Sequence, residues 1–313
     1  MARYYDPKAD LTFKKIFGQH PKLLISFLNA IMPFEADRHI VDLEYLPSEM
    51  VPENPGKKFS LVDVRCIDNY KRQFIVEMQI NWYHAFMKRI VFNAGKAYVR
   101  QLDCAEDYQL LQPVYTLAIL NENFDHKTDR FYHHYQIINR ENSDEIIPYL
   151  EFVLVELTEK FRPETITDRK LMVLWLRFLK ELNEDMYELP PEMMENEDIR
   201  MAAQLCERKG YTLEEQARYD GFWDAVRIEK TISNSALKRG IEEGIKEGRK
   251  EGIKEGIKEG IKEGIKEGRK EGETNNQMKV IANGHKAGYS VEIISTMTGL
   301  APEEVMKIIE EFK

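Results

Sequence analysis

The sequence contains little cysteine. Cys66, Cys104 and Cys206 are spread over 313 residues, and no paired histidines accompany them at the spacing of zinc ligands. An odd number of widely separated cysteines argues against both a disulfide framework and a zinc site. We therefore expect a globular protein whose thiols are reduced and structural.

A long apolar run is also lacking. No stretch approaches the ~18 apolar residues that span a bilayer, and the N-terminal sequence MARYYDPKAD has no apolar core of the kind that signal peptides contain. These absences predict a protein without a membrane partner and with a cytoplasmic location.

The sequence has no excess of positive charge. Lysine and arginine number 45 against 54 acidic residues, which gives a net charge of −9. This balance excludes a uniformly basic nucleic-acid-binding protein, so any contact with DNA needs a local positive surface. The stretch from Trp82 to Leu102 offers one, because it has no acidic residue. Its cations are Lys88, Arg89, Lys96 and Arg100.

This basic stretch has the periodicity of a helix, with one apolar face and one polar face. We expect the polar face to neutralise the phosphates of DNA bound in a cleft beside it. We also expect Tyr98 and Gln101 to point toward that cleft. The alternative is an ordinary solvated amphipathic helix. The apolar face holds Phe86, Ile90, Ala94 and Ala97, and the polar face holds Arg89, Asn93, Lys96 and Arg100.

Two carboxylates lie on neighbouring predicted strands in residues 60–80, SLVDVRCIDNYKRQFIVEMQI. Alternation places Glu77 and Gln79 on one face of the second strand, and a hairpin brings Asp63 of the first strand near Glu77. Both strands are apolar enough to be central, so these carboxylates need a partner, a solvated cleft or a cation. Carboxylate oxygens are ligands that Mg²⁺ or Mn²⁺ prefers. The alternative is a pair of solvent-exposed carboxylates on an ordinary hairpin.

The elements around this hairpin are predicted from periodicity. Residues 11–31 form two short helices separated at Gly18 and Pro21, and residues 39–46 form a first strand. Further strands are expected at residues 114–120, 131–139 and 149–157. The order is helix, three strands, helix, strand. The adjacent His133 and His134 point to opposite faces of a strand and are interpreted as structural.

The arrangement resembles the PD-(D/E)XK nuclease superfamily. Asp63 matches the first acid of its motif and Glu77 the second, whereas Gln79 lies where the motif has lysine. Over roughly the first two thirds of the chain the sequence resembles, more narrowly, the recombination-promoting nuclease and putative transposase family. The segments that carry this resemblance are DLTFKKIFGQHPKLLISFLNAIM, IVEMQ and RIVFNAGKAYVRQL.

The resemblance implies an α/β, restriction-endonuclease-like fold with an αβββαβ core and a mixed sheet. It also implies a Mg²⁺-dependent (or Mn²⁺-dependent) DNA endonuclease that acts in recombination or transposase-like processing. Asp63, Glu77 and the main-chain carbonyl of Met78 would hold the ion, and Gln79 would orient the attacking water. Glutamine is uncharged, so cleavage would be slow or would depend on Lys14, Lys96 or a second metal. The alternative is a weak or inactive DNA-binding, regulatory protein.

Asp10 has two interpretations. It immediately precedes the first predicted helix, so its residue type favours an N-cap. The resemblance instead matches Asp10 to an acidic residue of the family's first helix, with a catalytic role. Lys14, one turn later, would face the same cleft and contact DNA.

The rest of the chain suggests separate segments after a nuclease-like domain at residues 1–160. Residues 161–239 are helical, and residues 240–273 repeat IKEG with glycine at every fourth position. Each glycine weakens a helix, so we expect a fraying helix or a tether. Residues 274–313 resemble a helix-turn-helix of three helices broken at Gly288 and Gly299. Its last helix begins with acidic residues, which favours homo-oligomerisation over base recognition.

Overall fold

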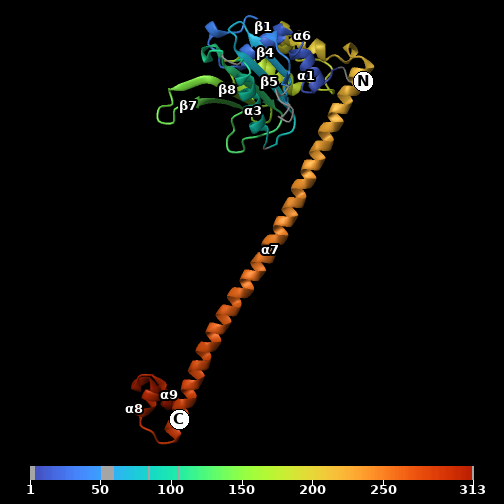
Figure 1. The fold of residues 1–313 in the computed structure, drawn as a ribbon. Coiled ribbons are helices and arrows are strands. Elements are labelled where there is room, and N and C mark those ends of the chain that lie inside the picture. The colour runs from blue at the N-terminus through green and yellow to red at the C-terminus, as the bar shows by residue number, and fades with distance from the viewer. Residues whose placement is uncertain (1–3, 51–59, 84, 104–105, 312–313) are drawn as a thin grey trace. The chain divides into compact units, whose positions relative to one another are not determined.

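The computed structural model describes residues 4–50, 60–83, 85–103 and 106–311 (Figure 1). The chain divides into two compact units, Met1–Ile232 and Ser233–Lys313. Within the described residues, no helix combines the length and the apolar character that a membrane span requires.

The first unit is built on a six-stranded mixed sheet in the order β1-β4-β5-β6-β8-β7. Strands β5, β6 and β8 are parallel to one another, and the other neighbouring pairs are antiparallel. The strands of this sheet are β1 (Leu43–Tyr45), β4 (Val64–Asp68), β5 (Gln73–Gln79), β6 (Val114–Leu120), β7 (Tyr132–Ile138) and β8 (Ile146–Glu156). A separate pair of short strands consists of β2 (Glu49–Met50) and β3 (Ser60–Leu61).

The chain order through this sheet is the predicted one. Helices α1 (Asp10–Phe17) and α2 (Pro21–Ile31) precede β1, β4 and β5, and α3 (Ala85–Val99) then leads into β6. Every residue of β6 is buried, as expected for a parallel strand that is covered on both faces. The predicted αβββαβ core with a mixed sheet is confirmed.

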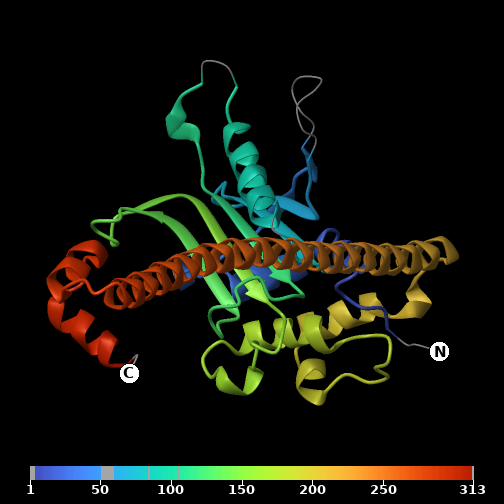
Figure 2. The same ribbon diagram turned by 90° about the horizontal axis from the view of Figure 1, so that it is seen from below.

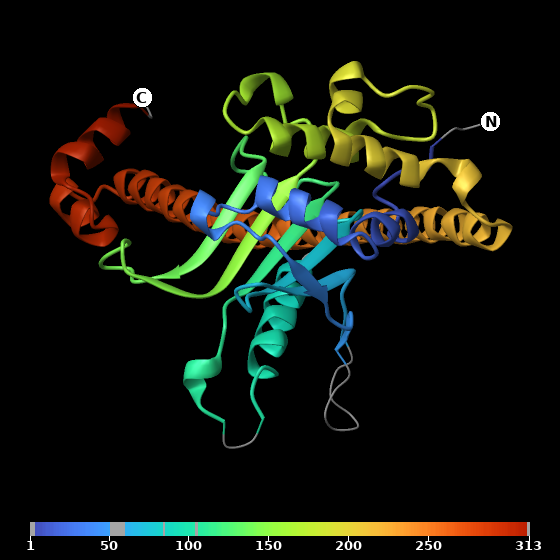
Figure 3. The same ribbon diagram turned by 90° about the horizontal axis from the view of Figure 1, so that it is seen from above.

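One face of the sheet is covered by α1 and α2 (Figure 3). Phe17 and Phe27 stack with ring centroids 4.4 Å apart, and Trp175 of α4 lies 5.5 Å from each. Gly18 and Pro21 separate the two helices as predicted. The helices that follow the sheet are α4 (Lys170–Glu181), α5 (Pro191–Glu195) and α6 (Glu197–Cys206). Short 3₁₀ helices lie at Ala36–Arg38, Tyr108–Leu110, Pro163–Thr165 and Arg208–Gly210.

Helix α3 packs on the opposite face (Figure 2). Phe86 and Ile90 contact the cluster that contains Ala118 of β6, and Ala94 and Ala97 contact the one that contains Ile75 of β5. All four helix side chains are fully buried, as the periodicity predicted. This packing fixes the helix beside the polar end of β5.

The β4–β5 turn forms where the sequence predicted it. The Asp68 carboxylate accepts hydrogen bonds from the backbone N–H groups of Tyr70 and Arg72 and from Nε of Arg72. Lys71 has a φ of 63°, a left-handed conformation that is uncommon for residues other than glycine. The turn pairs Val64 with Val76, so Asp63 comes immediately before the paired strand.

The second unit consists of helices. Helix α7 (Leu213–Lys286) begins in the first unit and contains the repeat, whose isoleucines are exposed. Helices α8 (Val291–Thr298) and α9 (Pro302–Glu311) follow Gly288 and Gly299, which have φ values of 75° and 69°. The predicted breaks are therefore confirmed. The core of this unit consists of Ile281, Ile294, Val305 and Ile309.

Candidate active site

Asp63 lies in a bend between β3 and β4, not on a strand as the alternation had indicated. Its Oδ2 atom accepts a 2.7 Å hydrogen bond from the backbone N–H of Met78 on β5. The prediction of the strand was wrong by one residue because the ladder starts at Val64. The bend nevertheless holds the carboxylate against the end of β5.

The surroundings of Asp63 oppose its negative charge. Burial, with smaller contributions from the nearby charges of Glu77 and Asp10, raises the pKa of this carboxyl to about 7. The hydrogen bond from Met78 and the charge of Lys14 act in the opposite direction but are weaker in sum. Asp63 therefore has a charge that the folded protein compensates only in part.

Glu77 and Gln79 point to the same side of β5, as predicted, and both contact Arg89 of α3. The Nη2 atom of Arg89 lies 2.6 Å from Oε2 of Glu77 and donates a 2.9 Å hydrogen bond to Oε1 of Gln79. The other oxygen of Glu77 accepts a 3.0 Å hydrogen bond from Asn93. Glu77 is only 2 % exposed, so its carboxylate is buried and both of its oxygens are occupied.

A cavity of about 190 Å³ joins most of the predicted catalytic residues. Asp10, Asp63, Met78, Gln79 and Arg89 all line it. The carboxylate of Glu77 lies behind Arg89 and does not line this cavity itself. The cavity thus combines carboxylates with a guanidinium group, which suits a ligand that carries both metal-binding and anionic oxygens.

Asp10 is the first residue of α1, and Ala9 is the N-cap, so the prediction of an N-cap role for Asp10 was wrong. Its carboxylate instead lies 2.7 Å from Nζ of Lys14, one turn along the helix. The sequence placed the helix start one residue late. As a result the acid faces the cavity rather than the helix N-terminus.

Part of the cavity wall consists of residues that sequence reasoning did not identify. Phe222, Val226 and Glu229 of α7 line the cavity, and Asn81 after β5 donates hydrogen bonds to Glu229 and to the carbonyl of Val226. These contacts join residues that are 148 and 145 positions apart. The sequence predicted that this segment is helical but not which surface it covers.

Lys8 is a further residue of the site that sequence reasoning missed. It lines the cavity, and its ammonium is held 3.0 Å from Asp6 and donates a hydrogen bond to the carbonyl of Leu179. Because its side chain is only 8 % exposed, this charge is neutralised inside the fold. The sequence places Lys8 in a short polar segment without periodicity, so nothing marked it.

The polar face of α3 differs from the prediction of one continuous basic surface. Asn93 is fully buried and contacts Glu77 and Ser60, and Arg89 points toward Glu77. Lys96 donates to the carbonyl of Met50, whereas Lys88 is exposed. Arg100 follows the end of α3 at Val99. The face therefore divides into residues that organise the site and residues that reach solvent.

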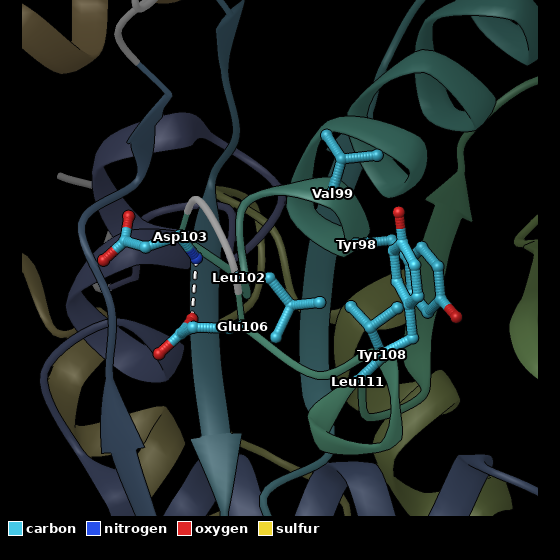
Figure 4. A pocket seen from close by; sticks show the side chains of 7 residues that line it. All are labelled: Tyr98, Val99, Leu102, Asp103, Glu106, Tyr108 and Leu111. Atoms are coloured by element: carbon cyan, nitrogen blue, oxygen red, sulfur yellow. Dashed lines mark hydrogen bonds between the residues drawn. The ribbon is translucent and has the colours of Figure 1, made fainter.

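Tyr98 and Gln101 do not face the cavity of the carboxylates, so that expectation was wrong. Tyr98 lines a different cavity, of about 660 Å³, together with Leu102 and Tyr108 (Figure 4). Gln101 exchanges two hydrogen bonds with the main chain of Gln112. Figure 4 also shows Glu106 accepting a hydrogen bond from the backbone of Asp103, so this acid caps a turn.

The carboxylate oxygens at this site meet the requirements of a divalent cation only in part. Asp63 faces the cavity with a charge that burial disfavours, and a cation beside it would remove that penalty. Glu77 becomes a ligand only when Arg89 releases its Oε2 atom. Among the described residues, no group of three or more histidine, cysteine or acidic side chains is placed to hold a metal ion. Of Asp63 and Glu77, only Asp63 therefore lines the cavity in this conformation.

His133 and His134, which the sequence analysis interpreted as structural, each lie close to a carboxylate. His133 lies 3.3 Å from Glu156, and His134 lies 2.8 Å from Glu151, on the two faces of β7. Neither lines the cavity of the carboxylates.

The sheet order, the flanking helices and the acids at the start of β4 and the end of β5 define an α/β protein of the restriction-endonuclease-like class. A family model described as "PD-(D/E)XK nuclease family transposase" matches residues 7–227. The match covers more than half of the chain, so the chain belongs to this family. Its general kind is therefore a nuclease, with DNA as the substrate that the family implies. Searches of curated proteins and of solved structures gave no match.

Proposed function

We propose that this protein is a divalent-cation-dependent DNA endonuclease that acts in recombination or transposase-like DNA processing. The cation is Mg²⁺ or Mn²⁺, which oxygen ligands favour. When bound, it polarises a phosphoryl oxygen and lowers the pKa of a water ligand. Asp63, Glu77 and the carbonyl of Met78 hold it in this proposal.

The other residues of the proposed site position the attacking water and the DNA. Gln79 positions the attacking water through its amide, and Asp10 contributes negative charge at the rim of the cavity. The backbone phosphates of the duplex are neutralised by the basic residues Lys14, Lys88, Arg89, Lys96 and Arg100. Phosphate contacts of this kind fix the register of the duplex without reading its sequence.

The observation that carries the proposal is the position of Asp63. Its carboxylate lines a cavity shared with Gln79 and Arg89, and burial raises its pKa to about 7. A carboxyl group in a cavity whose pKa is strongly shifted is a candidate functional group. An ordinary surface acid is solvated and does not have the free-energy cost of a buried charge. Family membership gives this carboxyl its nuclease interpretation.

The test is cleavage of supercoiled plasmid in Mg²⁺ or Mn²⁺ by the full chain. The Asp63→Ala variant should lose nicking while its circular dichroism spectrum stays that of the parent. The matched control is Asp144→Ala in the exposed β7–β8 turn, which should cleave normally. Equal cleavage by the Asp63 variant would exclude this site.

A second candidate function is that of a DNA-binding or regulatory protein with a weak site. Both oxygens of the Glu77 carboxylate already accept hydrogen bonds, and Gln79 carries no charge, which favours this candidate. It predicts duplex binding without cleavage. In that case the Lys88→Ala variant should lower the slope of log affinity against log salt by ~1, while Lys127→Ala in the β6–β7 loop leaves it unchanged.

We also propose that the second unit mediates association of two copies of the chain. Its exposed apolar side chains support this role, because apolar groups on a small helical unit are stabilised by burial against a partner. They are Met278, Ile293, Met297 and Met306.

A further inference from the structure

Arg89 has a donor group without an acceptor. Its Nη2 atom is used by Glu77 and Gln79, whereas its Nε atom is buried and has no hydrogen-bond partner among the described residues. A buried donor left without an acceptor costs free energy and is uncommon in folded proteins. Protein atoms cover this Nε in the present conformation, but the side chain lines the acid cavity, so a ligand that draws the guanidinium toward itself is expected to supply the missing acceptor.

The guanidinium group is held from three sides. Glu77 and Gln79 contact Nη2 at 2.6 and 2.9 Å, and the group lies 4.9 Å from the ring centre of Phe86. Phe86 is itself fully buried against the sheet, so this support is rigid. A planar guanidinium fixed in this way presents its remaining donors in a geometry that matches the oxygens of a phosphate.

Other cations near the cavity are engaged in the fold. Lys8 is buried against Asp6 and the carbonyl of Leu179. Lys14 lies 2.7 Å from Asp10, and Lys96 donates to the carbonyl of Met50. Arg89 is also ion-paired, but its side chain is 38 % exposed and its Nε atom has no hydrogen-bond partner among the described residues.

We propose that Arg89 is a catalytic residue that contacts a non-bridging oxygen of the scissile phosphodiester. It supplies from α3 the positive charge that Gln79 cannot supply from β5. This inference rests on the proposed nuclease function. In the free protein Glu77 neutralises the guanidinium, and Gln79 keeps it at the cavity when the phosphate arrives.

The reaction is a hydrolysis. The oxygen of water forms a bond to phosphorus, and the bond from phosphorus to one deoxyribose oxygen breaks. The water loses one proton to solvent, and the departing deoxyribose oxygen gains one. Negative charge builds on the non-bridging oxygens during this exchange, and a fixed guanidinium beside them lowers the barrier.

The same geometry predicts that loss of the Arg89 guanidinium raises the affinity for the metal, although it lowers the rate of cleavage. Arg89 and a divalent cation compete for Oε2 of Glu77, since the guanidinium contacts that oxygen in the free protein. Removing the guanidinium should therefore strengthen cation binding while it slows cleavage. A residue with a purely structural role would weaken both.

The test compares Arg89→Gln with Lys127→Gln, which removes an exposed cation in the β6–β7 loop. Single-turnover plasmid cleavage should fall about 10²- to 10³-fold in Arg89→Gln, as expected for loss of a charge at the developing oxyanion. Duplex affinity by fluorescence anisotropy should change less than about threefold in both variants, because one phosphate contact is a small part of binding. Affinity for Mn²⁺ alone, followed by calorimetry, should increase in Arg89→Gln only.

A rescue variant tests directly whether a positive charge on β5 can replace the one that Arg89 supplies from α3. Gln79→Lys in the Arg89→Gln background restores a cation at the end of β5 and should recover cleavage at least about tenfold. Should Arg89→Gln fail to fold, Arg89→Lys keeps a charge beside Glu77. Lysine lacks the fork that reaches Glu77, Gln79 and phosphate together, so its cleavage should still fall about tenfold at unchanged duplex affinity.

The possible failures are distinguishable. If the parent chain cleaves plasmid and both folded Arg89 variants cleave equally fast, the role of Arg89 is excluded while the nuclease function stands. A loss of cleavage matched by an equal loss of duplex affinity would make Arg89 a DNA-binding residue only, which also overturns the inference. If the parent chain cuts with neither Mg²⁺ nor Mn²⁺, the nuclease function fails and the role of Arg89 fails with it.

Discussion

Asn81 and Glu229 are joined by a 3.0 Å hydrogen bond between the Nδ2 amide of the first and the Oε2 atom of the second. The same amide lies 3.3 Å from the carbonyl oxygen of Val226. Through these contacts the loop after β5 fixes the first turns of α7 against the cavity of Asp63. One side-chain amide thus supplies two of the polar contacts that hold the wall of the site.

Replacement of Asn81 by alanine should loosen this wall. We expect faster amide hydrogen exchange in residues 222–232, because the helix loses its polar contact with the loop while its own hydrogen bonds remain. Exchange followed by mass spectrometry measures the effect. Asn139→Ala is the matched control, since it removes a 2.8 Å hydrogen bond to Glu145 in the β7–β8 turn. Unchanged exchange in residues 222–232 would show that the wall does not depend on the amide of Asn81.

The ionisation of Asp63 should make stability depend on pH. Its folded-state pKa of about 7 lies above its ordinary value of 3.8, so the folded protein binds this proton more tightly than the unfolded chain. Between about pH 4 and 7 the free energy of unfolding should therefore decrease as the pH rises, and this contribution levels off above pH 7. The direction is opposite to that of a carboxylate stabilised by a salt bridge.

The Asp63→Asn variant isolates this contribution because asparagine keeps an acceptor for the N–H of Met78. At pH 8, with a chelator present, we expect it to be more stable than the parent by about 1 to 3 kcal/mol, a range reduced for the partial exposure of the side chain. At pH 4 the difference should vanish. Urea denaturation across this pH range gives the measurement, with Asp144→Asn as the control. A difference that stays constant with pH would contradict the raised pKa.

Glu77 and Arg89 should be strongly coupled in stability. Glu77→Ala removes the acceptor of both Arg89 and the buried amide of Asn93, so we expect a loss of about 2 to 4 kcal/mol. Once Arg89 is alanine, the same change should cost less, with a coupling free energy of about 1 to 3 kcal/mol. Urea denaturation of the two single variants and the double variant closes the cycle. Additivity within ~0.5 kcal/mol would mean that the pair is broken in solution.

Association through the second unit should be sensitive to charge on its apolar surface. Met306 is 52 % exposed on α9, so Met306→Glu is expected to favour the monomer without unfolding the helices. Light scattering after size-exclusion chromatography measures the mass. Ser235→Glu adds the same charge at an exposed position of α7 and serves as the control. If the parent chain has the monomer mass at all concentrations, the proposed association is excluded.

Local sequence patterns predicted much of the fold. Strand β6 matches its predicted range of residues 114–120, and the α1–α2 break falls at Gly18 and Pro21. These elements are specified by nearby residues, through apolar periodicity and through backbone preferences of glycine and proline. The common face of Glu77 and Gln79 follows from alternation alone for the same reason.

The partners of these side chains were harder to predict because they depend on packing between distant segments. Helical spacing placed Arg89 on a basic surface, but only the docking of α3 on the sheet directs it toward Glu77. Likewise, Asp63 lies in a bend because β4 starts at Val64, a register that alternation does not define to within one residue. The wall from α7 has no local signature at all.

The repeat within α7 has a consequence for how this chain changes over generations. Neither the core around the sheet nor the core around Ile281 contains a side chain from residues 241–272, all of which are exposed. Gain or loss of a whole IKEG copy by slippage of its coding DNA would remove no packed contact from either core. Selection on folding should therefore tolerate copy-number variation here, while it restricts even single-residue shifts around Asp63.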